Sequence, residues 1–210
     1  NALVIVDVQN DFCPGGSLAV PEGDRVVPVI NRLQARFDLV VATQDWHPAN
    51  HGSFAANHEG KQPGEVVDLN GLEQILWPVH CVEHTAGAAF HPNLDQARIA
   101  KVFRKGTDPA IDSYSGFFDN AHRKATGLGD FLKEREVTDV TICGLATDYC
   151  AKFTALDAVA LGFATRVVED ACRGVNLKPG DVVRAIEEMR ARGIKIIRAA
   201  DLQEPSGTTP

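Results

Sequence analysis

The segment GLATDYC, from Gly144 to Cys150, places a cysteine directly after an apolar run that is typical of a buried strand. If a helix begins here with Thr147 or Asp148 as its N-cap, Cys150 lies in the first turn. Free N–H groups and the helix dipole would stabilise a thiolate there and lower the thiol pKa, which makes Cys150 a candidate nucleophile. A small side chain buried beneath the helix is the alternative, because free cysteine is among the most buried residue types.

The other cysteines are weaker candidates for a chemical role. Cys143 lies inside the apolar run and is interpreted as a core residue. A Cys143–Cys150 redox pair would need the strand and the helix start to meet at disulfide distance. The chain has five cysteines and no CxxC pair. These features disfavour a disulfide framework and a cysteine-rich zinc site, and they favour a reducing cytoplasm.

An acidic residue, Asp7, stands inside the first apolar run, ALVIVDV. A carboxylate in such a run is costly unless it has a partner or a function. Lys105, which follows the run KVFR, can supply the positive charge. The carboxylate can take the thiol proton as general base, and the ammonium can hold it ionised and favour the thiolate. A buried Asp7–Lys105 pair with an unrelated cysteine is the alternative.

The segment DWHPANH places Asp45 and His47 two residues apart, on one side of an extended chain. With a third histidine, they can bind Zn²⁺, Mn²⁺ or Fe²⁺ and leave coordination positions open. His51 and His80 are the candidates for the third ligand, and the residues alone do not decide between them. Single histidines are also common on loops without any metal.

Apolar runs that alternate with helical segments must position these side chains. Strands are predicted over the runs at 2–8, 39–47, 99–106, 139–145, 164–170 and 194–200. Helices are predicted near 24–36, 127–136, 149–161 and 180–192. This alternation indicates a parallel sheet covered on both faces, in which ligands bind at the carboxyl ends of the strands. The candidate residues follow four of those strand ends. The aperiodic stretch from about 46 to 98 is predicted to be a long functional loop.

The composition is that of an ordinary globular protein, since 44% of the 210 residues are hydrophobic and 23% are charged. The net charge of −7 and the absence of a basic run disfavour nucleic acid and membranes as partners. No apolar stretch is long enough to cross a bilayer, and the N-terminus lacks the features of a signal peptide. We expect one domain over residues 1–203, a polar tail over 204–210 and a cytoplasmic location. A homo-oligomer is compatible with the sequence.

Several long segments resemble the nicotinamidases, within the isochorismatase-like cysteine hydrolases. The resemblance covers nearly the whole chain in the expected order. It is carried by the segments VDVQNDFCPGGSLAV, DWHPANHGSFA, WPVHCVEHTAGAAFHP, FRKGTDPAIDSYSGFFD and GLATDYCAKFTALDA. The resemblance implies a three-layer α/β/α sandwich with a mainly parallel sheet of roughly six strands.

The resemblance also implies roles for individual residues. Asp7, Lys105 and Cys150 match the family's catalytic triad. The backbone amides of Ala146 and Cys150 match the oxyanion hole, and a cis peptide bond is implied before Ala146. The resemblance implies His80 as the third ligand beside Asp45 and His47, and it places His51 and Ser53 near the ion, reached through water. Some family members recruit a second loop histidine directly, so His51 is also a candidate ligand. The residues that match the substrate pocket are Phe12, Leu18, Trp77, Tyr114 and Tyr149.

The activity implied by the resemblance is hydrolysis of nicotinamide to nicotinate and ammonia in NAD salvage, with pyrazinamide as a further substrate. One divalent metal ion, Zn²⁺ before Fe²⁺ or Mn²⁺, and no organic cofactor are expected. Three other functions are alternatives to nicotinamide hydrolysis. A hydrolase of another amide would not need the metal, and an isochorismatase would lack the cysteine nucleophile or the metal site. A non-enzymatic zinc-binding module would leave the triad unexplained.

Overall fold

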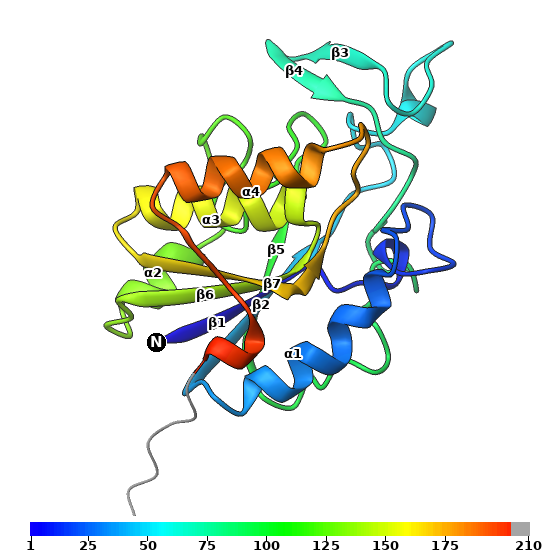
Figure 1. The fold of residues 1–210 in the computed structure, drawn as a ribbon. Coiled ribbons are helices and arrows are strands. Elements are labelled where there is room, and N and C mark those ends of the chain that lie inside the picture. The colour runs from blue at the N-terminus through cyan, green and yellow to red at the C-terminus, as the bar shows by residue number, and fades with distance from the viewer. Residues whose placement is uncertain (203–210) are drawn as a thin grey trace, which may run out of the picture.

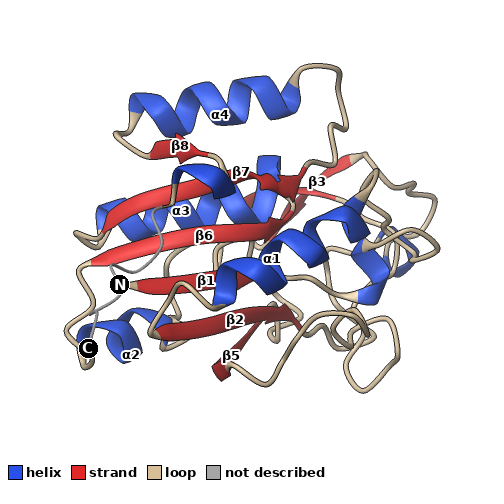
Figure 2. Cartoon of the chain, turned by 60° about the horizontal axis from the view of Figure 1, so that its bottom comes forward, coloured by secondary structure: helices blue, strands red, loops and turns tan. Residues whose placement is uncertain are grey.

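A sheet of six parallel strands lies at the centre of the computed structural model, which describes residues 1–202. The strands are β1 (Ala2–Val6), β2 (Leu39–Asp45), β5 (Ile99–Lys105), β6 (Asp139–Leu145), β7 (Ala164–Arg173) and β8 (Lys195–Ile197). Their order across the sheet is β5-β2-β1-β6-β7-β8 (Figure 2). All five residues of β1 are buried, as expected for a central strand with both faces covered.

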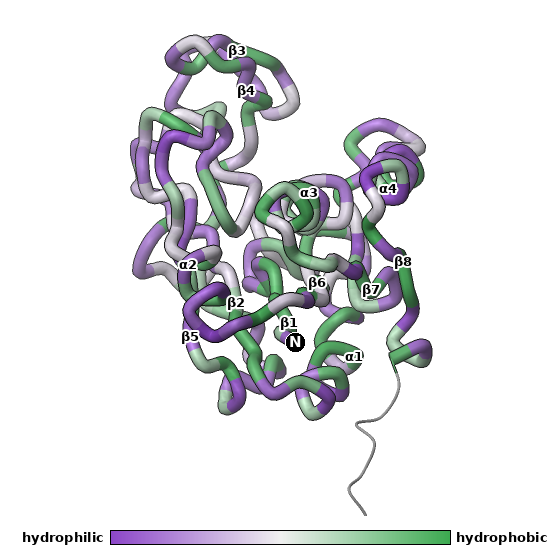
Figure 3. The backbone as a smooth tube through the Cα atoms, turned by 90° about the vertical axis from the view of Figure 1, so that its left-hand side faces the viewer, coloured by the Kyte–Doolittle hydropathy of each residue, from purple (hydrophilic) through white to green (hydrophobic). Residues whose placement is uncertain are grey.

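Helices cover both faces of the sheet (Figure 1). The helices are α1 (Val26–Gln34), α2 (Leu128–Lys133), α3 (Lys152–Ala160) and α4 (Asp181–Ala191). Alternate residues of β1 point to opposite faces: Leu3 and Ile5 pack in the core with α1, whereas Val4 packs in the core with the other three helices. Hydrophobic positions therefore gather in the central strands, while α4 at the outside carries many hydrophilic residues (Figure 3).

This architecture confirms the predicted three-layer α/β/α fold with its six-stranded sheet. The first strand is shorter than the predicted run because Asp7 adopts a left-handed backbone conformation, with a φ of 47°, directly after Val6. No helix within residues 1–202 is long and apolar enough to cross a membrane. The polar tail predicted for residues 204–210 lies outside the described residues.

The stretch from 46 to 98 contains regular structure that the sequence reading missed. The strands β3 (Val66–Leu69) and β4 (Leu72–Ile75) pair antiparallel in a hairpin. Asn70 and Gly71 connect them with φ values of 55° and 84°, and an Asn-Gly pair between short apolar segments favours such a two-residue turn. The hairpin projects away from the main sheet (Figure 1).

Candidate active site and metal centre

The side chains of Asp7, Lys105 and Cys150 meet at the carboxyl ends of three parallel strands. The Lys105 Nζ lies 2.9 Å from Asp7 Oδ2 and 3.4 Å from the Cys150 Sγ. A carboxylate oxygen of Asp7 lies within 4.8 Å of the same sulfur. Thr43 donates a hydrogen bond of 2.6 Å to Asp7 Oδ1, and the Lys105 ammonium lies against Oδ2. Because a carboxylate oxygen can accept more than one hydrogen bond, Asp7 can still take a proton from the thiol.

Burial dominates the acid–base properties of these groups. Burial raises the pKa of Asp7, and the charge of Lys105 opposes that rise only in part. Burial would lower the pKa of Lys105, but the carboxylates of Asp45 and Asp7 hold it well above its usual value. Burial also raises the pKa of Cys150 well above that of a free thiol, although Lys105 lowers it. The lowered thiol pKa predicted from the sequence is therefore wrong, because the sulfur is buried beside two carboxylates.

The turn that carries Cys150 differs from the predicted helix start. Residues Thr147–Ala151 form a single π-helical turn, η4, with Ala146 in the N-cap position. Neither Thr147 nor Asp148 caps it. The Asp148 carboxylate instead accepts backbone N–H groups from Val175, at 2.8 Å, and Asn176, at 2.7 Å. The peptide bond between Leu145 and Ala146 is cis, as the family resemblance predicted.

Asp45, His47 and His80 form a buried cluster beside the triad. Each side chain offers one ligand atom, and the three atoms lie within 4.8 Å of one another. Asp45 Oδ2 lies 3.4 Å from His47 Nε2 and 3.8 Å from His80 Nε2. The other carboxylate oxygen of Asp45 contacts Lys105 Nζ. Asp45 therefore connects the cluster to the triad.

The hydrogen bonds of the histidines show which ring nitrogens can bind a metal. His47 Nδ1 and His80 Nδ1 each contact a backbone carbonyl, of Gly106 at 2.8 Å and of Pro78 at 2.7 Å. Because a carbonyl can only accept, both Nδ1 atoms carry hydrogen, so Nε2 is the atom of each ring that faces the cluster and offers a lone pair when the ring is neutral. His47 Nε2 is buried and has no hydrogen-bond partner within residues 1–202. One carboxylate oxygen and two imidazole nitrogens suit a divalent transition-metal ion.

Burial would lower the pKa of His47, but the Asp45 carboxylate raises it above its usual value, so a bound metal ion must displace a proton from this ring. Burial would raise the pKa of Asp45, but Lys105 and His47 outweigh it and hold the carboxyl below its usual range. Burial, together with the charge of His47, lowers the pKa of His80 to about 4. His80 is therefore neutral near pH 7, as a metal ligand must be.

His51 lies against the cluster as a different tautomer from His80. Its ring centroid is 4.3 Å from that of His47. His51 Nδ1 accepts the backbone N–H of Ser53 at 3.2 Å and lies 2.7 Å from the Ser53 hydroxyl. Burial and the charge of His47 lower the pKa of His51 to about 4, so the ring is neutral and its Nε2 carries the hydrogen. Together with His47 and Asp112, His51 also forms a second buried group whose possible ligand atoms lie within 4.8 Å of one another.

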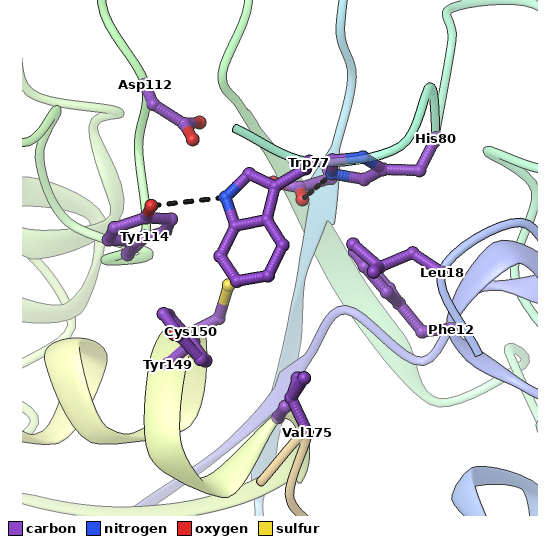
Figure 4. Close-up of a pocket in the computed structure, with 11 residues that line it drawn as sticks. Phe12, Leu18, Trp77, His80, Asp112, Tyr114, Tyr149, Cys150 and Val175 are labelled. Carbon is purple, nitrogen blue, oxygen red and sulfur yellow. Dashed lines mark hydrogen bonds and ion pairs between the residues drawn. The ribbon is translucent and has the colours of Figure 1, made fainter. Parts of the chain in front are cut away.

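A small cavity opens onto both the sulfur and the cluster. It is lined by all five residues that the resemblance placed in the pocket, Phe12, Leu18, Trp77, Tyr114 and Tyr149. Ala146, Cys150, Asp45 and His80 line the same cavity (Figure 4). The Trp77 indole donates a hydrogen bond of 3.2 Å to the Tyr114 hydroxyl, and the Trp77 and Tyr149 rings meet edge to face at 4.9 Å. These aromatic walls suit a flat, partly apolar molecule.

Sequence reasoning missed several residues of the site. Asp112 and Val175 also line the cavity. Gln74, on β4, donates hydrogen bonds of 3.2 Å to both Asp112 Oδ2 and the Tyr114 hydroxyl, so the hairpin supports the pocket wall. The Asn-Gly turn would have revealed the hairpin, but no local pattern marks Asp112 or Val175, which stand in irregular segments.

Comparisons with known proteins agree with this geometry. Residues 1–201 match the family model described as the isochorismatase domain. The nicotinamidase of Escherichia coli (strain K12) is 53% identical over 210 residues, which cover 98% of each chain. The solved structure of a nicotinamidase/pyrazinamidase of Acinetobacter baumanii is 50% identical, with a TM-score of 0.93 over 96% of this chain and 97% of that one.

A third relative was solved with a metal ion. The pyrazinamidase of Pyrococcus horikoshii, in complex with zinc, is 41% identical to this chain and superposes with a TM-score of 0.76. The match covers 94% of this chain and 98% of that one. From the family match over almost its whole length, and from the similarity of its fold, this chain belongs to the isochorismatase domain family.

Proposed function

We propose that this enzyme hydrolyses nicotinamide to nicotinate and ammonia through a thioester on Cys150, and that it hydrolyses pyrazinamide in the same way. One observation carries the assignment: the thiol of Cys150 opens into the same aromatic-walled cavity as Asp45 and His80. A carboxamide bound over the sulfur can therefore have its ring next to the metal cluster. The nicotinamidases and pyrazinamidases among its relatives support this substrate class.

The first step forms the thioester. Asp7 Oδ2 takes the thiol proton as the sulfur of Cys150 attacks the carboxamide carbon, because the raised pKa of the thiol requires a base at the moment of attack. Lys105 lowers the pKa of Asp7 against the larger effect of burial, and it offsets the negative charge that develops on the sulfur. The backbone amides of Ala146 and Cys150 stabilise the oxyanion of the tetrahedral intermediate. The C–N bond then breaks, and ammonia leaves with the proton from Asp7.

The second step hydrolyses the thioester. Asp7, ionised again, takes a proton from a water molecule, whose oxygen attacks the thioester carbon. The C–S bond breaks, the sulfur takes back the proton from Asp7, and the acid product leaves and loses its remaining proton to solvent as nicotinate. Asp7 and Lys105 therefore serve both steps, and the mechanism needs no organic cofactor.

In this proposal Asp45, His47 and His80 hold one divalent ion, with zinc as the first candidate because the Pyrococcus horikoshii relative was solved with it. When bound, the ion supplies a Lewis acid for the ring nitrogen of the substrate. Trp77 and Tyr149 then hold the ring so that its carboxamide lies over the sulfur, and His51 and Ser53 act from outside the direct ligands. The free state of all five cysteines supports the cytoplasmic location that we infer for the enzyme.

The test compares two amides and two histidine variants. Ammonia release from nicotinamide should be fast, and release from benzamide, which lacks the ring nitrogen, should be slow. His80→Ala should lose both the metal and nicotinamide turnover, whereas His51→Ala, as the matched control, should retain most of the metal. Equal rates with both amides, or full nicotinamide turnover by metal-free His80→Ala, would show that the metal does not orient the substrate.

A further inference from the structure

The side chain of Gln9 is fully buried and bonds to the backbone of Asp45 from both ends of its amide. Gln9 Oε1 accepts the Asp45 N–H at 2.8 Å, and Gln9 Nε2 donates to the Asp45 carbonyl at 2.8 Å. The same Nε2 also donates to the carbonyl of Ala88 at 2.9 Å. One side chain therefore satisfies both backbone groups of the residue that joins the triad to the metal cluster.

The sheet register explains why a side chain is needed here. The pairing of β1 with β2 extends only as far as Ile5 and Ala42. On its other side, β2 remains paired with β5 up to Asp45 and Lys105. The end of β2 therefore has no strand neighbour on the β1 side, and buried backbone groups must still find partners. The amide of Gln9 takes the place of that neighbouring strand.

Gln9 also contacts the triad through its own backbone. Its N–H donates to the carbonyl of Asp7 at 2.9 Å. Asp7 and Asp45 both contact Lys105, from opposite halves of the site. Gln9 thus fixes the distance between the carboxylate that we assign as the base and the carboxylate that we assign as a metal ligand.

We propose that Gln9 is a positioning residue for the metal centre. Its amide holds the backbone of Asp45 so that Oδ2 faces His47 and His80 while Oδ1 faces Lys105. This inference rests on the proposed role of Asp45 as a metal ligand. A bonded neighbour that orients a metal ligand typically contributes 10- to 100-fold in metal affinity.

The test replaces Gln9 with Met, which has a similar length but neither donor nor acceptor of comparable strength. In the folded protein, Gln9→Met should bind zinc about 10- to 100-fold more weakly, as measured by competition with a chelator. Gln44→Met is the matched control. Gln44 is also buried and also donates to the Ala88 carbonyl, at 2.9 Å, but its side chain makes no hydrogen bond to Asp45 within the described residues. Its loss should leave the zinc affinity within about twofold of the original.

A purely structural role would give a different result. It would lower the melting temperature of the metal-free protein equally in Gln9→Met and Gln44→Met and leave the zinc affinity of both unchanged, which would overturn the inference. If Gln9→Met does not fold, the zinc affinity of Gln9→Asn, whose amide is one methylene too short, is compared with that of Gln44→Met in the same way.

Asp45→Ala separates the proposed positioning role of Gln9 from the proposed metal site. Loss of zinc in Asp45→Ala without loss in Gln9→Met removes only the positioning role, whereas retention of zinc in Asp45→Ala removes the proposed metal site.

Discussion

The ammonium of Lys105 is the central charge of the site. It pairs with Asp7 and Asp45, lies 3.4 Å from the sulfur of Cys150 and donates to the backbone carbonyl of Ser113 at 2.9 Å. The lysine can remain charged at complete burial because the two carboxylates offset its lost hydration. The triad and the metal cluster therefore form one electrostatic unit.

Removing this charge should change the titration of the thiol. Lys105 lowers the pKa of Cys150 against the larger effect of burial, so Lys105→Met should raise that pKa further. Because the thiolate is the reactive form, alkylation of Cys150 should then require a higher pH. The measurement is the rate of alkylation across pH, followed by mass spectrometry of the peptide that contains Cys150. Lys101→Met, a change at an exposed residue of β5, is the control and should leave the profile unchanged. An unchanged profile in Lys105→Met would remove Lys105 from the triad.

The sequence predicted which residues meet at the site, but not the burial and the charges around them. Asp7, Lys105 and Cys150 could be grouped because each stands at or just after the end of a predicted strand. The direction of the thiol pKa could not be predicted, since it depends on burial and on the carboxylates around the sulfur. Asp112 shows the same limit, because only the folded chain brings this loop residue to the cavity.

At the scale of elements, a buried carboxylate connects the π-turn η4 to a distant segment of the chain. Asp148 is buried, and both of its oxygens accept backbone N–H groups from the segment after β7. This connection fixes the turn that carries Cys150 against residues 175 and 176. Sequence reasoning placed Asp148 at this helix start correctly but assigned it a local capping role, because the segment that it contacts lies 27 residues away.

Loss of this carboxylate should therefore destabilise the enzyme. Asp148→Ala leaves two backbone N–H groups without their acceptor, which should lower the free energy of unfolding by about 2 kcal/mol or more. Chemical denaturation followed by fluorescence measures this loss. Asp181→Ala removes a carboxylate that accepts one backbone N–H, from Lys178, at the surface, and it should cost less. Equal stability losses in the two variants would mean that Asp148 does not anchor the turn.

Most elements could be predicted because their signals are local. The runs at 39–47, 99–106 and 139–145 correspond to β2, β5 and β6, and the helix near 180–192 corresponds to α4. The hairpin of β3 and β4 was missed because its strands are short and mostly exposed or half-buried, so they lack a continuous apolar signal. Its role at the site depends on the hydrogen bonds of Gln74 to Asp112 and Tyr114. These partners are distant in sequence, so no local pattern predicts the contacts.

At the scale of the whole molecule, the parallel sheet brings the site together. Asp7, Asp45, Lys105 and Cys150 stand at or shortly after the ends of four strands, which lie next to one another in the order β5-β2-β1-β6. All four side chains therefore reach the same edge of the sheet. The loop between β2 and β5 then adds His47, His80 and Trp77, which complete the metal cluster and the pocket wall.

The central claim is that Cys150 is the nucleophile of a nicotinamide hydrolase, and ammonia release by two cysteine variants tests it most directly. Cys150→Ala, with its metal content unchanged, should release no ammonia from nicotinamide. Cys143→Ala should retain most of the activity, because Cys143 is buried in β6 and its sulfur faces the Val4 carbonyl at 3.8 Å. A folded, metal-bound Cys150→Ala protein that releases ammonia at the original rate would contradict the account.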